Sequence, residues 1–491
     1  MKMMLSEIAG HVRGKLVGAD VAVTSTSIDT RSIQPGQLYV AIKGEQFDGN
    51  DFVEQAEQAG AIAAIVHSGV TVNIPHIIVD DTRLALAELA GAWRRQAAVP
   101  AGCIGSLPTA TLPPSLAVGR IGSLPIATLP PSLAVVGVTG SNGKTTVKEM
   151  TAAILGASET GSDDVLYTQG NLNNDIGVPL TLLRLNERQR YAVIEMGANH
   201  PGEIAYTSRY AEADVVILNN AGAAHIAGFG SLDGVAEAKG EIIATLKQDG
   251  VAVLNRDDAY FDYWKSLAGH RKVLSFGLSD AADVRAKGIT TAIRDNAFAT
   301  TFELFTPQGA QSCVLKLAGR HNVVNALAAT AASLALNISL AQIVRGLSSV
   351  KPVTGRLQLL VGRLGNRIID DSYNANAMSL EAGLDVLAGC ASRPWLVLGA
   401  FGELGPDSPK IHQDIGGLIK ARGVLRLLAT GNDARNTVQA FGNGATFFDT
   451  QSDLIAALQQ ELKGDETLLI KGSRSQRMEN VAAALVENFR T

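Results

Sequence analysis

The sequence predicts an α/β protein of three domains built around largely parallel sheets. Three observations support this prediction. The chain has 491 residues, which is more than one hydrophobic core usually organises. Short apolar segments alternate with helical segments along most of the chain, as expected of parallel sheets. Between Arg95 and Lys144 the sole charged residue is Arg120, and this proline-rich stretch separates the first region from the second.

Residues 1–98 are expected to form the first domain, a compact α/β module. The strand-like segments "QLYVAI", "AIAAIV" and "HIIVD" alternate with the helical segments "DFVEQAEQAG" and "TRLALAELAGAWRRQ". At the N-terminus, Glu7, Arg13 and Lys15 interrupt the apolar residues at helical intervals, which is wrong for a secretory signal. These first residues predict a small amphipathic surface helix.

Residues 99–133 predict a proline-rich linker. Pro108, Pro113 and Pro125 are among the prolines that would break any helix long enough to cross a bilayer. The segment is also an internal duplication, because "IGSLPTATLPPSLAV" from Ile104 recurs from Ile121 as "IGSLPIATLPPSLAV". Two copies do not make a solenoid. We expect an irregular surface segment and no membrane span.

Residues 134–350 and 351–491 predict two further α/β domains. In the first, "YAVIEMG", "ADVVILNN" and "GVAVLN" each end at a turn rich in Asn, Gly or acid. This pattern indicates a parallel sheet whose ligands gather at the C-terminal ends of the strands. In the second, "NRIIDD", "PWLVLGA", "VLRLLATG", "ATFFD" and "TLLIKG" repeat the alternation as a smaller sheet. This last region lacks G-x-G-x-x-G, so no dinucleotide is assigned to it.

The segment "AVVGVTGSNGKTTVKEM" predicts a strand, a phosphate-binding turn and a helix. Glycines let successive N–H groups point inward at the positive end of the helix, and a lysine adds a mobile cation. The match is a variant, because the strict pattern would place a glycine at Val138. An ordinary strand-turn-helix junction is the alternative. The residues expected to hold the nucleotide phosphates are Gly140, Ser141, Asn142, Gly143, Lys144, Thr145 and Thr146.

Two residues are expected near this turn because they follow neighbouring strands of the same sheet. Glu195 ends "YAVIEM" and His225 follows "VVILNN". Together with the Thr145 hydroxyl, a carboxylate and an imidazole can hold a divalent cation, and Mg²⁺ takes its remaining ligands from water and phosphate oxygens. Each has an ordinary alternative, since Glu195 could cap the helix "HPGEIAYTSRYA" and His225 could be a hydrogen-bonded loop histidine.

Further candidates are less specific. Lys239 lies between Glu237 and Glu241 on a helix, where a solvated charged face is the common explanation. "IKGSRSQRMENV" places Lys471, Ser473 and Ser475 before a helix, which is typical of an anion site, although serine capping explains part of the pattern.

Composition narrows the class of partner and the compartment. The net charge of -5 and the absence of a long basic run give no electrostatic footprint for nucleic acid. Cys103, Cys313 and Cys390 show no paired spacing, so neither a disulfide framework nor a thiolate metal site is indicated. We expect a cytoplasmic protein.

Taken together, the motifs resemble those of the Mur ligase family, the ATP-dependent amino-acid ligases that build the peptidoglycan peptide in the bacterial cytoplasm. "TGSNGKTT", "NLNNDIGVP", "IEMGANHPGEI", "NNAGAAHIAGFGS", "EAKGEI", "GRHNVVNALAA", "GRL" and "KGSRSQRMENV" occur in the family's order over almost the full length. "DTRSIQPGQLYVAIKGEQFDGNDF" is similar to the N-terminal uridine-nucleotide module of the two later ligases of the pathway. "DDSYNAN" at 370–376 is similar to the motif of the last ligase, and the D-N-P-R of the diaminopimelate-adding ligase is missing.

The resemblance implies an N-terminal UDP-substrate domain, a central P-loop ATPase domain and a C-terminal Rossmann-like domain. It also implies ATP, two Mg²⁺ ions, and Lys239 carried as a carbamate beside Thr145, Glu195 and His225. The catalytic set is Lys144, Lys239, His225 and Glu195. Further ATP-binding residues are Asn322, Asn325, Arg356 and Asp371. The substrate-binding residues are Ser27, Thr30, Arg31, Lys43, Asn171, Asn173, Tyr373, Asn374, Asn376, Lys471 and Ser473.

The implied reaction joins D-alanyl-D-alanine to UDP-N-acetylmuramoyl-tripeptide through an acyl phosphate, and we expect a monomer. Departures from the family pattern are Asn50 for the histidine of "DGHDF", Ala377 for the proline of "NANP", and "GAFGELG" for "GDMGELG". Another ligase of the superfamily, diaminopimelate- or lysine-adding or folylpolyglutamate-synthesising, is the first alternative. A nucleotide switch is the second, but the N-K-x-D motif for guanine is missing.

Overall fold

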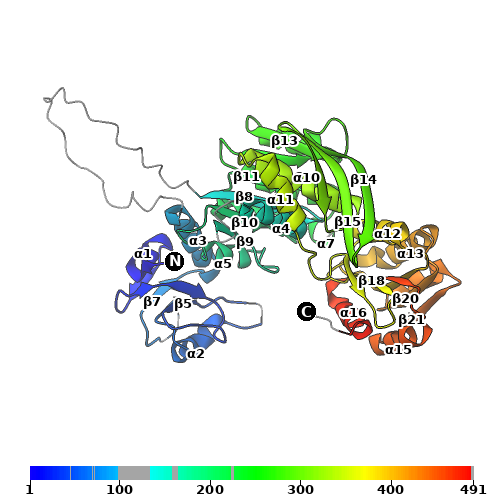
Figure 1. Cartoon of the computed structure of the whole chain (residues 1–491). Helices are drawn as coiled ribbons and strands as arrows, with labels where there is room; N and C mark the ends of the chain where they lie inside the picture. The colour runs from blue at the N-terminus through cyan, green and yellow to red at the C-terminus, as the bar shows by residue number, and fades with distance from the viewer. Residues whose placement is uncertain are drawn as a thin grey trace, which may run out of the picture. The chain divides into compact units, whose positions relative to one another are not determined.

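The computed structural model describes residues 1–44, 46–68, 70, 72–97, 133–157, 164–222 and 226–487 (Figure 1). Apart from Leu133, the expected linker at 99–133 lies outside these residues, and so does His225. The chain divides into two compact units: the first comprises 1–136, 163–196 and 206–213, and the second 137–162, 197–205 and 214–491. Over the described residues, no helix combines the length and apolarity that crossing a bilayer requires.

The N-terminal residues form a five-stranded sheet of order β2-β7-β6-β5-β4. Strands β4 to β7 are parallel and β2 is antiparallel to β7. The bounds are β2 Lys15–Val17, β4 Ser25–Ser27, β5 Gln37–Val40, β6 Ala63–His67 and β7 His76–Val79, with helices α1 Leu5–His11, α2 Val53–Gln58 and α3 Thr82–Ala97, and a small pair β1 Met3–Met4 and β3 Ala22–Val23. The sequence predicted strands β5, β6 and β7 and helices α2 and α3. Helix α1 buries Leu5 and Ile8 completely, so one of its faces is core.

A nine-stranded sheet follows, of order β16-β15-β14-β13-β12-β11-β8-β10-β9. Its strands are β8 Ala134–Thr139, β9 Val165–Tyr167, β10 Tyr191–Glu195, β11 Val215–Leu218, β12 Val251–Asn255, β13 Lys272–Gly277, β14 Val284–Arg294, β15 Ala297–Thr306 and β16 Gly309–Leu315. The helices are α4 Lys144–Gly156, α5 Gly177–Leu182, α6 Glu203–Ala211, α7 Ile226–Phe229, α8 Leu232–Ala244, α9 Phe261–Ala268, α10 Arg320–Ala335 and α11 Leu340–Ser349.

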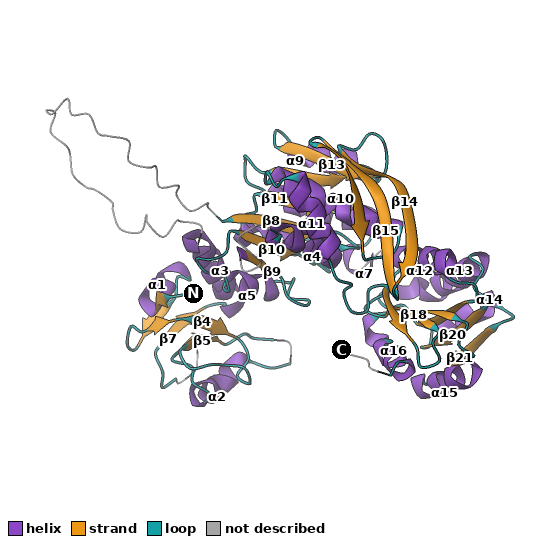
Figure 2. Ribbon diagram, in the orientation of Figure 1, coloured by secondary structure: helices purple, strands orange, loops and turns teal. Residues whose placement is uncertain are grey.

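The last three strands of this sheet were not predicted, because they are antiparallel (Figure 2). Strands β14 and β15 are joined by Asp295 and Asn296, whose φ angles are 50° and 55°. Two consecutive positive φ values belong to the tight hairpin turn that matches the strand twist, and Asp and Asn tolerate that region well. On the ladder, the hydroxyls of Thr291 and Thr300 lie 2.9 Å apart, a cross-strand pair that helps to fix the register.

The C-terminal residues form a six-stranded sheet of order β17-β18-β22-β19-β20-β21. All neighbours are parallel except β17, which is antiparallel to β18. The strands are β17 Gln358–Val361, β18 Arg367–Asp371, β19 Pro394–Gly399, β20 Arg426–Thr430, β21 Ala445–Phe448 and β22 Thr467–Lys471, and the helices are α12 Ala377–Cys390, α13 Ser408–Ala421, α14 Ala434–Phe441, α15 Gln451–Glu461 and α16 Glu479–Leu485. This confirms the predicted α/β fold class for the region.

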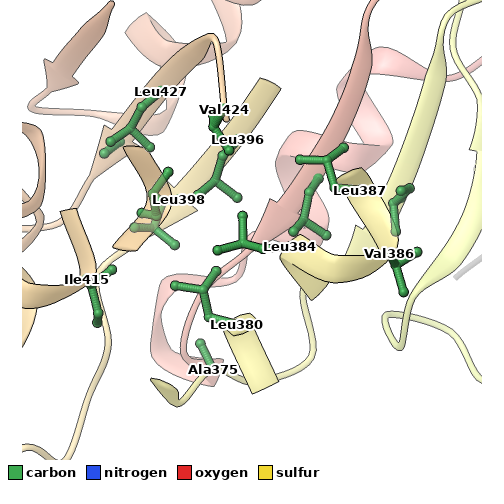
Figure 3. Packing of buried hydrophobic residues seen from close by; sticks show 14 of the residues in the cluster. Ala375, Leu380, Leu384, Val386, Leu387, Leu396, Leu398, Ile415, Val424 and Leu427 are labelled. Carbon is green, nitrogen blue, oxygen red and sulfur yellow. The ribbon is translucent and has the colours of Figure 1, made fainter. Parts of the chain in front are cut away.

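Side chains of β19 alternate between two cores, as the two-residue period of a strand requires. Leu396 and Leu398 pack against α12 to α14 on one face (Figure 3). Trp395 and Val397 pack against α15 and α16 on the other face. The first core also includes Phe298 of β15, which is 3% exposed. The long β14–β15 hairpin therefore shares its hydrophobic packing with α12.

Candidate functional site

The predicted phosphate turn lies between β8 and α4, as the sequence indicated. Gly140 and Gly143 have φ angles of 149° and 81°, where a side chain is strained. A Cβ atom at Gly143 would lie 2.4 Å from the Asn325 Oδ1 atom, so the close packing also requires glycine there. Because α4 begins at Lys144 and runs for 13 residues, its positive end is directed at this turn. The backbone therefore fits a phosphate group.

A chain of buried amides supports the turn from inside. Asn219 Nδ2 donates to Asn142 O and to Asn325 Oδ1, both at 2.9 Å. Asn325 Nδ2 in turn donates to Asn322 Oδ1 at 3.1 Å. Asn322 and Asn325 therefore lie behind the phosphate turn. Sequence reasoning missed Asn219, although its place at the end of the strand "VVIL" was the signal that could have found it.

Lys144 and Thr145 open the helix and already have polar partners. Lys144 Nζ donates to Gly140 O at 2.6 Å and to Ser141 O at 3.2 Å, so the ammonium folds back over the turn. Thr145 Oγ1 accepts a hydrogen bond from Arg356 Nη2 at 3.0 Å. The Arg356 guanidinium lies 4.2 Å from the centre of the Tyr373 ring. Four residues predicted to bind the nucleotide or the substrate next to it therefore lie close together: Lys144, Thr145, Arg356 and Tyr373.

Lys239 is a buried lysine, which excludes the solvated-face interpretation. It is 2% exposed on α8, and its Nζ lies 5.3 Å from the centre of the Phe229 ring. Burial, together with the smaller effect of the positive charge of Lys144, lowers the pKa of Lys239 to about 7. An amine with such a pKa is neutral in a large fraction of molecules at neutral pH.

Glu195 belongs to the first unit and is 2% exposed at the end of β10. Its Oε1 accepts a hydrogen bond from Asn173 Nδ2 at 2.9 Å. The N–H groups of Asn199 and His200, just before α6, donate to Glu203 Oε2 at 2.7 and 3.3 Å, so Glu203 caps this helix end from within the helix. In this unit Asn171 adjoins the pair, since its carbonyl accepts from the Asn173 N–H at 2.7 Å.

The residues expected to bind the uridine nucleotide lie around β4 and β5. Arg31 forms a two-pronged ion pair with Asp29 at 2.9 and 2.7 Å, and this partner lowers the pKa of Asp29 to about 2. Ser27 donates to Asp29 O at 3.1 Å, and Thr30 lies between these residues in sequence. Lys43 pairs with Asp48 across an isolated backbone bridge.

The departure at Asn50 is accommodated inside the same module. Asn50 is 6% exposed and donates from Nδ2 to His67 O at 3.2 Å. His67 itself contacts both carboxylate oxygens of Asp48 at 2.9 Å. A histidine, His67, therefore lies next to the turn that contains Asp48 and Asn50.

In the C-terminal region, Lys471 and Asp371 form a buried ion pair across neighbouring strands. Lys471 Nζ lies 2.5 Å from Asp371 Oδ2 and 3.1 Å from Asn374 O, and Lys471 is 1% exposed. In this structure the Asp371 carboxylate holds the Lys471 ammonium, and the hypothesis of a second anion site there stays a prediction. The following helix α16 also starts later, at Glu479, and has seven residues.

Two amides connect α12 to the phosphate turn. Asn376 caps α12 by accepting from the Ser379 N–H, and its Nδ2 donates to Asn142 Oδ1 at 2.8 Å. Asn142 Nδ2 also contacts Met378 Sδ at 3.3 Å. The motif "DDSYNAN" is therefore near the phosphate turn in the second unit.

Within the described ranges, no three His, Cys, Asp or Glu side chains come together in a way that could hold a metal ion. In the second unit, the Thr145 hydroxyl is a hard oxygen ligand of the kind that Mg²⁺ binds, with phosphates and water supplying other ligands.

Three family models match the chain. The Mur ligase family catalytic domain matches residues 22–94, the Mur ligase middle domain residues 138–333, and the Mur ligase glutamate ligase domain residues 355–474. Each matched range lies inside one of the ranges 1–98, 134–350 and 351–491.

Relatives extend the match over the whole chain. The UDP-N-acetylmuramoyl-tripeptide--D-alanyl-D-alanine ligase of Escherichia coli (strain K12) is 43% identical over 494 residues, covering 99% of each chain. A crystal structure of MurF from Acinetobacter baumannii has a TM-score of 0.86 at 33% identity and covers 99% of each chain. The MurF ligase of Thermotoga maritima, solved in complex with ADP, has a TM-score of 0.77 at 26% identity, over 94% of this chain and 97% of that one. The chain belongs to the Mur ligase family.

Proposed function

We propose that this chain is the ATP-dependent ligase that joins D-alanyl-D-alanine to UDP-N-acetylmuramoyl-tripeptide. The observation that carries the proposal is the phosphate turn, where Arg356 donates a hydrogen bond to Thr145 and Asn376 donates one to Asn142. The chain is also 43% identical to a ligase of that name. The resulting UDP-linked pentapeptide is a precursor of peptidoglycan. We place the enzyme in the cytoplasm, as a monomer.

The chemistry needs an activated carboxylate. The terminal carboxylate of the tripeptide attacks the γ-phosphorus of ATP, the bond from that phosphorus to the β,γ-bridging oxygen breaks, and ADP leaves. The amine of D-alanyl-D-alanine then attacks the acyl carbon, the C–O bond to phosphate breaks, and the amine loses a proton. Positioning and charge stabilisation dominate such phosphoryl transfers.

Gly140 to Thr146 hold the ATP phosphates in this proposal. The N–H groups of the turn and the positive end of α4 provide the fixed donors. Lys144 exchanges its bonds to Gly140 O and Ser141 O for phosphate oxygens. Asn322 and Asn325 keep the turn rigid from behind, and Arg356 and Asp371 lie on the nucleotide side. Thr145, Glu195 and His225 would hold Mg²⁺, which would offset phosphate charge.

We further propose that Lys239 carries a carbamate. The uncharged amine adds to the carbon of CO₂, forming an N–C bond with release of a proton, and the product is a carboxylate-like group. Two observations support this: Lys239 is 2% exposed, and its lowered pKa leaves the reactive neutral amine well populated. The carbamate oxygens can ligate a second Mg²⁺, which a protonated amine cannot do.

The two organic substrates bind to different regions. Ser27, Thr30, Arg31 and Lys43 contact the uridine nucleotide, and Asn171 and Asn173 the tripeptide side. The dipeptide binds at the carboxyl edge of the C-terminal sheet, where ligands of parallel sheets gather. Its residues are Tyr373, Asn374, Asn376, Lys471 and Ser473. We assign the domains to residues 1–98, 134–350 and 351–491, with 99–133 as linker.

Phosphate release by the purified chain tests the function. Release should require ATP, the UDP-linked tripeptide and D-alanyl-D-alanine together, and parallel assays with lysine or diaminopimelate as third residue of the tripeptide define the substrate. Lys144→Met should abolish release, whereas Lys272→Met, at an exposed position on β13, should leave it unchanged. Equal turnover with free diaminopimelate and the dipeptide-linked precursor would instead identify the preceding ligase of the pathway.

A further inference from the structure

A loop of the C-terminal region, residues 400–404, lies at the carboxyl end of β19. Strand β19 pairs in parallel with β22, with Leu398 opposite Lys471. The loop therefore leaves the sheet next to the segment that carries Lys471 and Ser473. Its tip, Gly402 and Glu403, is exposed. No residue of this loop belongs to the site proposed above.

Backbone contacts hold the loop against the end of β22. The Ala400 carbonyl accepts from Ser473 Oγ at 2.8 Å and from the Ser473 N–H at 3.4 Å. A Cβ atom at Gly472 would lie 3.0 Å from the Gly399 Cα atom, so the two strand ends approach as closely as glycines permit. Any movement of the loop would thus displace the Ser473 hydroxyl.

His412 fixes the other side of the loop. Its side chain is fully buried on α13, and Nε2 accepts a hydrogen bond from the Phe401 N–H at 3.0 Å. Nδ1 lies 2.9 Å from the Ser408 carbonyl oxygen. An oxygen acceptor on one side and an N–H donor on the other define the tautomer: Nδ1 carries the proton and Nε2 does not.

The ring is held in this orientation by a second partner. Ser408 Oγ donates to Asp433 Oδ2 at 2.5 Å, which turns the hydroxyl lone pairs toward His412 Nδ1, 3.3 Å away. The Phe401 ring also packs on the imidazole edge, with 5.8 Å between ring centres. A continuous chain of contacts thus runs from Asp433 through Ser408 and His412 to the loop.

Simple packing does not explain an imidazole here. Burying a polar ring is costly unless both nitrogens are satisfied, and an apolar side chain would fill the same space without that cost. One nitrogen of His412 is used within α13, and the other is used on the loop. The hydrogen-bonding capacity of the His412 imidazole is therefore used to hold loop 400–404.

We propose that His412 is a positioning residue for dipeptide binding: its Nε2 holds the Phe401 N–H so that loop 400–404 and Ser473 face the incoming D-alanyl-D-alanine. This inference rests on the proposed function, because it takes Lys471 and Ser473 to lie on the dipeptide side. His412 itself does not touch substrate. It determines where the loop and the Ser473 hydroxyl stand.

Three substitutions test the proposal. In His412→Asn, the amide can still donate to Ser408 but no longer accepts from Phe401. We expect the KM for D-alanyl-D-alanine to rise about tenfold, equivalent to the loss of one hydrogen bond, while the KM values for ATP and the UDP-linked tripeptide stay within about twofold. His412→Gln places an oxygen near the position of Nε2 and should recover most of the dipeptide affinity. Thr437→Val, also fully buried in the same core region, is the control and should match the parent.

Two outcomes would overturn the proposal. One is an unchanged KM for the dipeptide in His412→Asn, and the other is a parallel rise of all three KM values, which indicates general loosening. Should the Asn variant not fold, ¹⁵N NMR of the parent decides, because a proton on Nε2 of His412 contradicts the hydrogen bond. A parent enzyme without dipeptide-dependent phosphate release refutes the proposed function instead, and the tautomer measurement separates the two failures.

Discussion

Arg94 is a buried arginine that stabilises the first unit, and its replacement by methionine is the sharpest stability test that the structure offers. The residue is 3% exposed on α3. Its Nε donates to Ala211 O at 3.0 Å and its Nη2 to Glu212 O at 2.7 Å, at the end of α6. Its Nη1 lies 3.1 Å from Glu212 Oε2. The guanidinium thus satisfies helix-end carbonyls and a carboxylate at once.

The expected cost follows from burial. Arg94→Met keeps most of the aliphatic volume but leaves two carbonyls and part of the Glu212 carboxylate without this donor. Breaking a buried charged pair from one side costs about 3–5 kcal/mol. For a unit of this size, that corresponds to a loss of roughly 6–20 °C in its melting temperature.

Arg95 provides a matched control, because it contacts the same carboxylate from the surface. Its Nη1 lies 3.0 Å from Glu212 Oε1, but its side chain is 56% exposed. An exposed pair of this kind is worth about 0–1 kcal/mol. Arg95→Met should therefore shift the melting temperature by no more than about 4 °C. Differential scanning fluorimetry, together with hydrogen exchange of the last turn of α6, measures both variants. Equal shifts for the two variants would refute the reasoning.

Two further predictions concern Lys239 and the β14–β15 hairpin. In CO₂-free buffer, Lys239→Met should be more stable than the parent at pH 7, and the advantage should shrink as the pH rises toward 10.5. The pKa of Lys239 falls from 10.5 in the unfolded chain to about 7 in the folded one, so the unfolded chain binds more protons over this range and the parent gains stability with pH. A stability difference that does not change with pH contradicts this. Phe298→Ala should cost about 3–5 kcal/mol because Phe298 is 3% exposed in the core it shares with α12, whereas Val314→Ala, at 42% exposure on β16, should cost almost nothing. Thermal melting of both variants measures these costs. Equal losses of stability in Phe298→Ala and Val314→Ala would contradict packing of the β14–β15 hairpin against α12.

The sequence was sufficient where a feature depends on a local pattern. The glycine turn was predictable because φ values at Gly140 and Gly143 and the start of α4 follow from neighbours in the chain. The strands of the C-terminal sheet were predictable because each is a short apolar run bounded by polar turns. The fold class and family are confirmed; the roles of the individual site residues stay predictions.

Pairings between distant residues were not predictable. The ion pair of Lys471 with Asp371 joins positions 100 residues apart, and no local signal distinguishes it from a lysine free to bind an anion. The burial of Lys239 depends on what packs over α8, which periodicity alone does not specify. The hairpin β14–β15 was missed because the interpretation favoured parallel strands, although alternation and the Asp295-Asn296 turn were present in the sequence.

The discontinuous first unit has a consequence for synthesis on the ribosome. Helix α3 is complete at Ala97, but the partners of Trp93 and Arg94 are Leu185, Ala211 and Glu212. Translation proceeds at about 5–20 residues per second, so roughly ten seconds pass between the synthesis of α3 and the synthesis of these partners. During that interval the nascent chain exposes the Arg94 guanidinium, which the finished protein buries, and the Trp93 indole N–H lacks its acceptor. A fragment that stops at residue 97 would keep this exposed face permanently, and we expect it to bind chaperones and to aggregate when expressed alone.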